Sequence, residues 1–395
     1  MDFRISNLLY FDHNATTPIA PEVAEVMLYA LRDIYGNPSS THQCGQSARQ
    51  ELERSRRAIA AFINASPTEF VFTSGGTEAN NLALLGFVRS LPAGRKHLIT
   101  TAIEHPSVLE PCRHLEREGT EVTIVGVDAQ GLIDPDEVRA SLRPETVLIS
   151  VMHANNEVGA IQPVRAIAGI VQEQRAAGQT LFLHSDGVQA MGKISVDVQA
   201  LGVDLYSMSA HKVFAPKGIG GLFVRKGTPL EAVQYGGRHE RNRRAGTENV
   251  PGAMAFARAV ELCNPAAAQR LAELRDQFEA EALSSFEGTT LNGAKDCRLP
   301  NTSNLFFPEV SAEALVIALD LKGMAVSTGS ACSSGSVEPS HVLLAMGRTR
   351  QEARSSVRFS FSRYNTAQEV DSLLSALSGS LANLRNRRAE DRVAV

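Results

Sequence analysis

The sequence predicts an α/β fold in which a mostly parallel, seven-stranded sheet is buried on both faces. Two observations carry this prediction: short apolar runs recur along the chain, and helical stretches separate many of them. The seven runs are 69–73, 98–101, 122–125, 147–151, 181–184, 205–207 and 221–224. Apolar runs that alternate with helices are typical of parallel sheets. Ligands of such sheets bind beyond the carboxyl ends of the strands, so the residues after each run are candidates for function.

The first strand of this sheet leads into a candidate anion-binding turn. Before it, residues 10–18 are an extended segment that ends in turn formers, and helices are predicted over 21–30 and 46–63. After it come the tight turn Ser74-Gly75-Gly76-Thr77 and a helix over 78–87. A strand, a glycine turn and a helix N-terminus in this order favour anion binding, because free backbone N–H groups and the helix dipole face the turn.

The C-terminal part of the sequence predicts a second, smaller α+β unit. Its expected elements are a helix over 269–281, a strand over 301–307, a helix over 312–321 and a strand over 356–361. The last of these alternates polar and apolar residues, as a half-exposed strand does. We therefore expect a large domain over 17–263 and a small domain made of 1–16 and 264–395.

The composition is that of an ordinary globular protein and argues against several function classes. Of the 395 residues, 43% are hydrophobic and 21% charged, and the formal net charge is -4. Without a basic run there is no electrostatic case for nucleic acid. The N-terminus lacks a signal-peptide pattern and no apolar run approaches bilayer length, so we expect a cytoplasmic protein without membrane contact. The five cysteines are scattered, with no C-x-x-C pair, and we expect free thiols and no metal site.

Lys212 ends the apolar run Ser207-Met208-Ser209-Ala210-His211-Lys212. A lysine amine attacks a carbonyl only when it is deprotonated, and partial burial beside cationic or polar groups lowers its pKa. His211 and Lys217 are such neighbours in the sequence. The alternative is that Lys212 extends from a strand end and keeps its amine in solvent.

Other polar residues after the strands suit a cofactor with an aldehyde, a phosphate and a pyridine ring, which is pyridoxal phosphate. Asp186, at a strand end, can hold the ring nitrogen, although capping a helix is as common for such a residue. Gln189 follows three residues later and can face the phenolate oxygen or solvent. His105 can stack on the ring or have a structural role.

A cysteine and an arginine lie further along the chain. Cys332 is in the Gly/Ser-rich stretch 327–336, which is either a linker or a mobile loop that brings a thiol to a bound substrate and then to a partner. Arg358 has the guanidinium fork that suits an α-carboxylate. A surface salt bridge is the alternative, and Arg354 and Arg363 are near enough to take the carboxylate instead.

Taken together, the motifs resemble those of the cysteine desulfurases, which belong to the fold-type I pyridoxal-phosphate superfamily. The resemblance extends from Asp12-His13-Asn14-Ala15-Thr16-Thr17-Pro18 to Arg358-Phe359-Ser360. The motifs between these ends are His184-Ser185-Asp186-x-x-Gln189, Ser209-Ala210-His211-Lys212, Pro216-Lys217-Gly218-x-Gly220, Arg244-Ala245-Gly246-Thr247-Glu248-Asn249 and Ser327-Thr328-Gly329-Ser330-Ala331-Cys332. The long loop around Cys332, about 325–338, is similar to that of NifS- and IscS-like enzymes rather than to the short segment of SufS-like enzymes.

The resemblance implies a role for each matching residue. Lys212 would bind pyridoxal phosphate covalently, Asp186 would hold the ring nitrogen and Gln189 the phenolate oxygen. His105 would stack on the ring and assist proton transfer. The phosphate would lie in a cup made by Gly76, Thr77, Ser209 and His211, with Thr247 reaching in from the other subunit of a homodimer.

The resemblance also implies a substrate site and a reaction. Asn14, Asn156 and Arg358 would bind L-cysteine, with Asn156 also near the cofactor. The Cys332 thiolate would attack the sulfur of the bound substrate, keep it as a persulfide and release alanine. A sulfur-acceptor protein, either an iron-sulfur scaffold or a sulfur carrier, would then receive the sulfur.

Three departures from the family pattern stand out. Gly76 occupies a position where relatives often have alanine, residues 246–250 look more like the NifS branch, and the tail after Arg385 does not resemble a scaffold-docking C-terminus. Two other hypotheses stay open at this stage. One is another fold-type I enzyme, such as a selenocysteine lyase or an aminotransferase. The other is a non-catalytic sulfur carrier or assembly platform.

Overall fold

A twisted seven-stranded sheet forms the centre of the computed structural model, which describes residues 8–264, 266–329 and 338–393. In spatial order its strands are β2 (Phe70–Thr73), β8 (Gly220–Val224), β7 (Leu205–Ser209), β6 (Phe182–Asp186), β5 (Thr146–Ser150), β3 (His97–Thr101) and β4 (Glu121–Val125). Strand β8 runs antiparallel to both neighbours, and the other pairs are parallel. The predicted α/β fold with a mostly parallel sheet is therefore confirmed.

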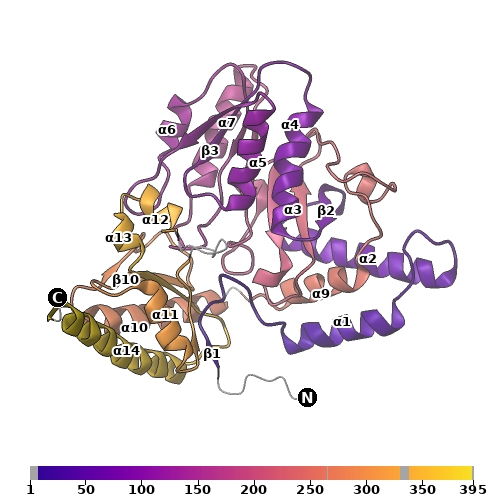
Figure 1. The fold of residues 1–395 in the computed structure, drawn as a ribbon. Coiled ribbons are helices and arrows are strands. Elements are labelled where there is room, and N and C mark those ends of the chain that lie inside the picture. Colours follow the sequence, from indigo (N-terminus) through magenta and orange to yellow (C-terminus); the bar gives the residue numbers. More distant parts are fainter. Residues whose placement is uncertain (1–7, 265, 330–337, 394–395) are drawn as a thin grey trace.

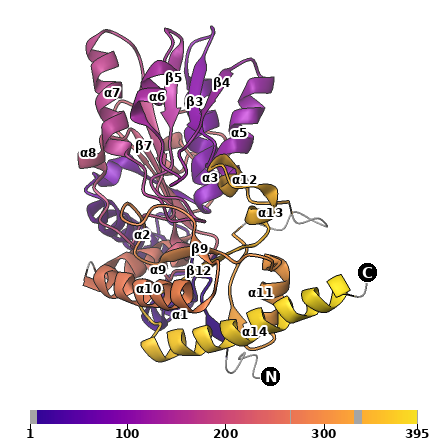
Figure 2. The ribbon, with the colours of Figure 1, turned by 90° about the vertical axis from the view of Figure 1, so that its left-hand side faces the viewer.

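Adjacent residues of the strands pack into two different cores, because successive side chains point to opposite faces of a sheet. Leu98, Leu148 and Leu205 face one core, whereas the next residues, Ile99, Ile149 and Tyr206, face the other. The first core is covered by α3 (Gly76–Asn81), a π-helical turn (Leu82–Gly86), α4 (Phe87–Ser90) and α5 (Pro106–Arg117). The second is covered in part by α7 (Val164–Ala176), and Figure 2 shows α5 and α7 on opposite sides of the strands. A single helix over 78–87 was expected, and the π-helical turn interrupts it.

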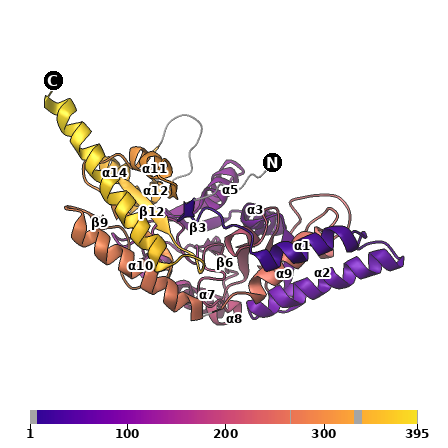
Figure 3. The ribbon, with the colours of Figure 1, turned by 90° about the horizontal axis from the view of Figure 1, so that it is seen from below.

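Three long helices close the second core at the end of the sheet. Figure 3 shows α1 (Pro21–Asp33), α2 (Gln43–Phe62) and α9 (Val250–Glu261) side by side. They contribute buried apolar residues such as Val23, Ile59 and Phe256 to that core. The shorter helices α6 (Pro135–Ala140) and α8 (Val198–Leu201) both contact α7. Among the described residues, no helix has both the length and the apolar character that a bilayer span requires.

A smaller unit lies beside the large sheet, as Figure 1 shows, and has its own core. Its three-stranded antiparallel sheet has the order β12 (Ser356–Ser360), β10 (Thr302–Phe306) and β9 (Thr290–Leu291). Strand β1 (Leu9–Tyr10) pairs in parallel with β11 (Met324–Ala325). The helices are α10 (Ala266–Ser285), α11 (Ala312–Asp320) and α14 (Ala367–Val393). The domain boundaries 17–263, 1–16 and 264–395 stay a prediction.

The short helices α12 (His341–Ala345) and α13 (Arg350–Ala353) bridge the two units. Val342 and Leu343 of α12 pack against Ile103, Met152 and Val158, which follow strands of the large sheet. The chain on the C-terminal side of residues 330–337 is thus fixed to the large unit.

The prediction that 356–361 is a half-exposed strand is wrong, because every residue of β12 is buried. Strand β10 pairs with one edge of β12, and backbone bridges from Asp12 to Ser360 and from Ser327 to Arg358 cover the other. The polar side chains of this strand therefore point into a polar interior rather than into solvent.

A buried ion pair fixes a strained turn near α2. Both guanidinium Nη atoms of Arg56 donate to the Glu240 carboxylate, at 2.7 and 2.6 Å, and the Phe72 backbone N–H donates to it at 2.8 Å. Glu240, Arg241 and Asn242 adopt φ of 43°, 57° and 64°, a left-handed conformation that costs roughly 1–2 kcal/mol per residue outside glycine. The ion pair therefore holds the backbone just before the segment that contains Thr247.

We predict that Arg56→Ala lowers the free energy of unfolding by about 3–5 kcal/mol, because it leaves the Glu240 carboxylate buried without its cation. Urea unfolding measures this change. Arg54→Ala on the same helix is the control: Arg54 pairs with Glu51 at 3.8 Å with a largely exposed side chain, and its loss should cost less than about 1 kcal/mol. Equal losses in the two variants would contradict the prediction.

Candidate active site

Lys212 lies in the short 3-10 turn Ala210–Lys212 that directly follows β7. Its Nζ donates to the backbone carbonyls of Asn14 and Ala15, at 2.5 and 2.6 Å. Burial, with a contribution from the Arg358 charge, lowers the pKa of Lys212 from 10.5 to about 8, although Asp12 and Asp186 act in the opposite direction. The amine is therefore held against the N-terminal segment and is partly neutral near physiological pH.

Asp186 is the last residue of β6, and its carboxylate is buried. One oxygen accepts the backbone N–H of Val188 at 2.9 Å, so Asp186 does cap the following turn. The other accepts Nδ2 of Asn80, on α3, at 2.7 Å. The carboxylate is thus oriented from two sides at the carboxyl end of the sheet.

The Asn80 amide connects Asp186 to His105. Its Nδ2 also donates to Oγ of Ser107 at 2.8 Å, and that hydroxyl is hydrogen-bonded to Nδ1 of His105 at 2.8 Å. The Ser107 backbone N–H donates to the same ring nitrogen, so His105 caps α5 and its proton lies on Nε2. Burial lowers the pKa of His105, and Lys212 and His341 add to this effect against Asp186. His105 is therefore a neutral imidazole held through its Nδ1 atom, and its Nε2–H has no hydrogen-bond partner among the described residues.

The glycine turn lies against Ser209. A Cβ built on Gly75, whose φ is 156°, would be 3.7 Å from the Ser209 hydroxyl. A Cβ on Gly76 would be 2.7 Å from Cγ2 of Val188, so an alanine here needs Val188 to move. Position 76 therefore has room only for glycine, because the Val188 side chain fills the space where a Cβ would lie. Thr77 is exposed at the start of α3.

His211 lies in the 3-10 turn that follows Ser209, close to the N-terminal segment. Its Nδ1 is hydrogen-bonded to Oγ1 of Thr16 at 3.1 Å. Burial, followed by the charges of Lys212 and Lys217, lowers its pKa to about 4. The ring is thus neutral, and it can bind an anion only through an N–H group rather than through a charge.

Asn14 connects Lys212 and Gln189 with the small unit. Its backbone carbonyl accepts from Lys212 Nζ and, at 3.0 Å, from Gln189 Nε2. Its side-chain Nδ2 donates to the Asn156 carbonyl at 3.1 Å and to Thr302 Oγ1 at 2.8 Å. The Asn14 side chain was expected to bind substrate, but its amide N–H groups are already used in hydrogen bonds within the protein.

Of the three arginines considered for a carboxylate, Arg358 is the buried one closest to these groups. Its Nη2 donates to Asp12 at 2.6 Å and its Nη1 to the Asn156 carbonyl at 3.0 Å. Its Nε is buried without a partner among the described residues. Arg354 is exposed. Arg363 lies 4.7 Å above the Phe214 ring and donates to a backbone carbonyl of residue 262 at 2.8 Å.

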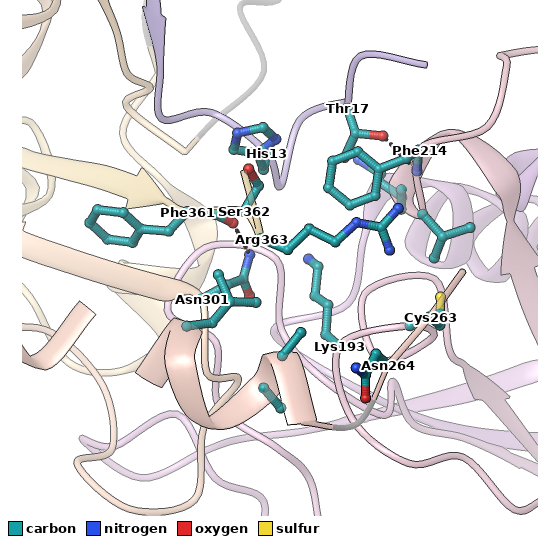
Figure 4. A pocket seen from close by; sticks show the side chains of 16 residues that line it. His13, Thr17, Lys193, Phe214, Cys263, Asn264, Asn301, Phe361, Ser362 and Arg363 are labelled. Atoms are coloured by element: carbon teal, nitrogen blue, oxygen red, sulfur yellow. Dashed lines mark hydrogen bonds between the residues drawn. The ribbon is translucent and has the colours of Figure 1, made fainter. Parts of the chain in front are cut away.

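A cavity opens beside these residues, on the side of α10. Figure 4 shows the side chains that line it, among them His13, Lys193, Cys263, Phe361 and Arg363, and Lys212 is part of the same lining. Lys193, like Asn80, was not considered in the sequence analysis. Asn80 lies one helical turn after the glycine turn, and this position could have indicated that its side chain faces the site. No feature of the sequence around Lys193 distinguishes that lysine from others.

Two predicted residues remain to be considered, Thr247 and Cys332. Thr247 is exposed in the segment between residue 242 and α9. Cys332 lies outside the described residues. The described chain that leads toward it pairs with Arg358, because the backbone N–H of Arg358 donates to the Ser327 carbonyl at 2.7 Å.

The donor set fits pyridoxal phosphate. A lysine with a lowered pKa can bind an aldehyde, a buried carboxylate at the next strand end can hold a pyridine nitrogen, and a glycine turn beside a serine hydroxyl can hold a phosphate. The fold and this arrangement are those of the fold-type I pyridoxal-phosphate enzymes.

Comparison with known proteins defines the family. The chain belongs to the class-V aminotransferase family, whose model matches residues 9–373. It is 44% identical over 380 residues to the cysteine desulfurase IscS of Dictyoglomus turgidum, and the match covers 95% of both chains. A solved structure of a NifS-like protein superposes with a TM-score of 0.89 at 36% identity, covering 95% of this chain and 99% of that one. The structure of SspA in complex with cysteine gives a TM-score of 0.79 at 36% identity, covering 90% and 99%.

We predict that Lys212 in the cofactor-free protein is acylated with a midpoint of about pH 8, because the neutral, reactive amine forms as pH rises through the lowered pKa. Peptide mass spectrometry after brief labelling at a series of pH values measures this midpoint. Arg358→Met should move the midpoint upward, since the Arg358 charge lowers the pKa of Lys212. A wild-type midpoint near 10.5, the ordinary lysine value, would refute the prediction.

Proposed function

We propose that this protein is a pyridoxal-phosphate-dependent cysteine desulfurase that takes sulfur from L-cysteine, holds it as a persulfide on Cys332 and releases L-alanine. The proposal rests on the agreement between the site and the relatives of this chain. A site made of a lysine, a carboxylate and a glycine turn occurs in a chain of which at least 95% aligns with proteins named cysteine desulfurase. The alternatives, a selenocysteine lyase or another aminotransferase, are not favoured by these relatives.

The cofactor would be held by residues at the carboxyl ends of the strands. Lys212 would bind it covalently, Asp186 would face the ring nitrogen, His105 the ring and Gln189 the phenolate oxygen. The phosphate cup would consist of Gly76, Thr77, Ser209 and His211, and Asn156 would lie beside the cofactor. When bound, pyridoxal phosphate withdraws electrons from the substrate's carbon atoms.

Arg358 is suited to hold the substrate's carboxylate. Its guanidinium already binds one carboxylate, that of Asp12, and its Nε has hydrogen-bonding capacity left among the described residues. A substrate carboxylate would share or replace the Asp12 contact, and the surrounding burial strengthens such a charge-assisted bond. Asn156 and Asn14 would complete this side of the site.

Proton transfer and sulfur transfer would use different residues. Lys212, whose pKa is about 8, can accept and return a proton near neutral pH. The Cys332 thiolate would attack the substrate's sulfur, so that a sulfur–sulfur bond forms and the carbon–sulfur bond breaks. The electron pair of the broken bond stays with the carbon, which is protonated and leaves as part of alanine.

We also propose a cytoplasmic homodimer that passes its persulfide sulfur to an acceptor protein, either an iron-sulfur scaffold or a sulfur carrier. Large apolar side chains are exposed on and just after α1, namely Leu28, Tyr29, Leu31 and Tyr35, and Tyr35 is 75% exposed. A face of this kind suits burial against a second copy. In such a dimer the partner's Thr247, exposed here, would complete the phosphate cup.

Cys332→Ala should lower sulfide release from L-cysteine in the presence of a thiol reductant by at least about 100-fold, because the nucleophile is lost. The variant should still bind cysteine, seen as a change in the visible absorbance of the cofactor. Cys263→Ala, which removes the cysteine of the cavity, serves as control and should keep its sulfide release. Unchanged release from the Cys332 variant would exclude the persulfide reaction.

Arg358→Ala should raise KM for L-cysteine about 30-fold, which corresponds to about 2 kcal/mol for a lost charge-assisted contact. Steady-state kinetics of alanine formation gives this value. The competing candidate is tested in parallel with Arg363→Ala, for which a KM within about threefold of wild type is expected. The opposite pattern would transfer the carboxylate site to Arg363.

A further inference from the structure

Lys193 is a buried lysine that lines the cavity next to the cofactor site, and the proposed reaction gives it no role. Its Nζ donates to Oε1 of Gln189 at 2.5 Å and to Oδ1 of Asn14 at 2.7 Å. Both acceptors are amide oxygens, so the lysine has no carboxylate to balance a charge in these two contacts. Burial, followed by the charges of Lys212 and Arg358, lowers its pKa well below the usual value. A buried amine of this kind is costly, and a core that needed only volume would be served better by methionine.

The two contacts determine which way the Gln189 amide faces. A side-chain amide has one accepting and one donating end, and the ends are exchanged by a rotation of 180°. Because Lys193 donates, it binds the oxygen and turns Nε2 the other way. There one N–H reaches the Asn14 carbonyl at 3.0 Å, and the second has no partner among the described residues.

The Asn14 amide is oriented by the same lysine. Its Oδ1 accepts from Lys193 and, at 3.0 Å, from Asn301 Nδ2. Its Nδ2 is therefore the end that donates to the Asn156 carbonyl and to Thr302 Oγ1. The Lys193 amine thus fixes the orientation of two neighbouring side-chain amides. The backbone carbonyl of Asn14 accepts hydrogen bonds from both Gln189 and Lys212.

We propose that Lys193 is a positioning residue: it locks the Gln189 amide with its free N–H directed at bound pyridoxal phosphate. This inference rests on the proposed cofactor, for whose phenolate oxygen Gln189 is the expected donor. Without Lys193, the Gln189 oxygen is buried without its donor, and only the bond from Nε2 to the Asn14 carbonyl still orients the amide. An amide held by this one bond rotates more freely, so its second N–H is directed less firmly at the phenolate oxygen and the cofactor is bound less tightly.

The test is a double-mutant cycle on pyridoxal-phosphate affinity, with Lys193→Met and Gln189→Leu alone and combined. We expect Lys193→Met to weaken binding about tenfold and to shift the visible absorbance maximum of the bound cofactor. In the Gln189→Leu background the same change should weaken binding less than about twofold, because the Gln189 amide is gone and the Asn14 oxygen still accepts from Asn301. Lys226→Met, at an exposed site, is the matched control and should leave affinity and spectrum unchanged.

Equal effects of Lys193→Met in the two backgrounds, or no effect in either, would overturn the proposal. Circular dichroism and the unfolding midpoint of the cofactor-free variants show whether they are folded. If Lys193→Met does not fold, the same cycle is run with Lys193→Leu, whose apolar side chain leaves the Gln189 oxygen without its donor and gives the same expectations. Failure of the proposed function is a separate result, because the wild-type protein would then bind no pyridoxal phosphate through Lys212.

Discussion

The hydrogen bonds of Asn14 are the constraint on which the rest of the site depends. The residue is buried in the segment that crosses from the small unit to the large one, and both its backbone and its side chain are used. Its carbonyl receives Lys212 and Gln189, and its amide is bonded to Lys193 and Asn156. Because a buried polar group costs free energy unless it is paired, these bonds specify one arrangement of the strand ends and of the small sheet. Lys212 is held in place by the same residue that joins the two units.

The second physical theme is an excess of positive charge in a desolvated place. Burial and the Arg358 charge lower the pKa of both Lys212 and Lys193, and the Lys212 charge adds to the shift at Lys193. Asp12 and Asp186 offset the shift at Lys212 only in part. Two consequences follow from this balance. The Lys212 amine becomes reactive near neutral pH, and the site favours ligands that bring negative charge, such as a phosphate and a carboxylate. A cofactor and an amino acid that carry these groups supply the missing anions.

Sequence periodicity and strand ends were enough to predict the sheet, and Lys212 and Asp186 lie at the ends of the strands that the apolar runs indicated. The sequence does not show which side chains from distant segments are hydrogen-bonded to one another. The role of Asn80 becomes visible only when α3 lies against Asp186, and that of Lys193 only when its amine contacts Gln189. Strand β12 was expected to be half exposed because its residues alternate between polar and apolar. Such alternation shows only that one face of a strand meets polar groups, and here these groups belong to the protein, near Asp12 and Ser327, rather than to solvent.

The central claim is that Lys212 is the residue that carries pyridoxal phosphate, although a second lysine lines the same cavity. Borohydride reduction of the purified, cofactor-loaded protein fixes the bond between lysine and cofactor, and peptide mass spectrometry then locates it. The account predicts that the mass of reduced cofactor is found on the peptide with Lys212, and that Lys193 is unmodified. Cofactor on Lys193, or on neither lysine, would contradict it.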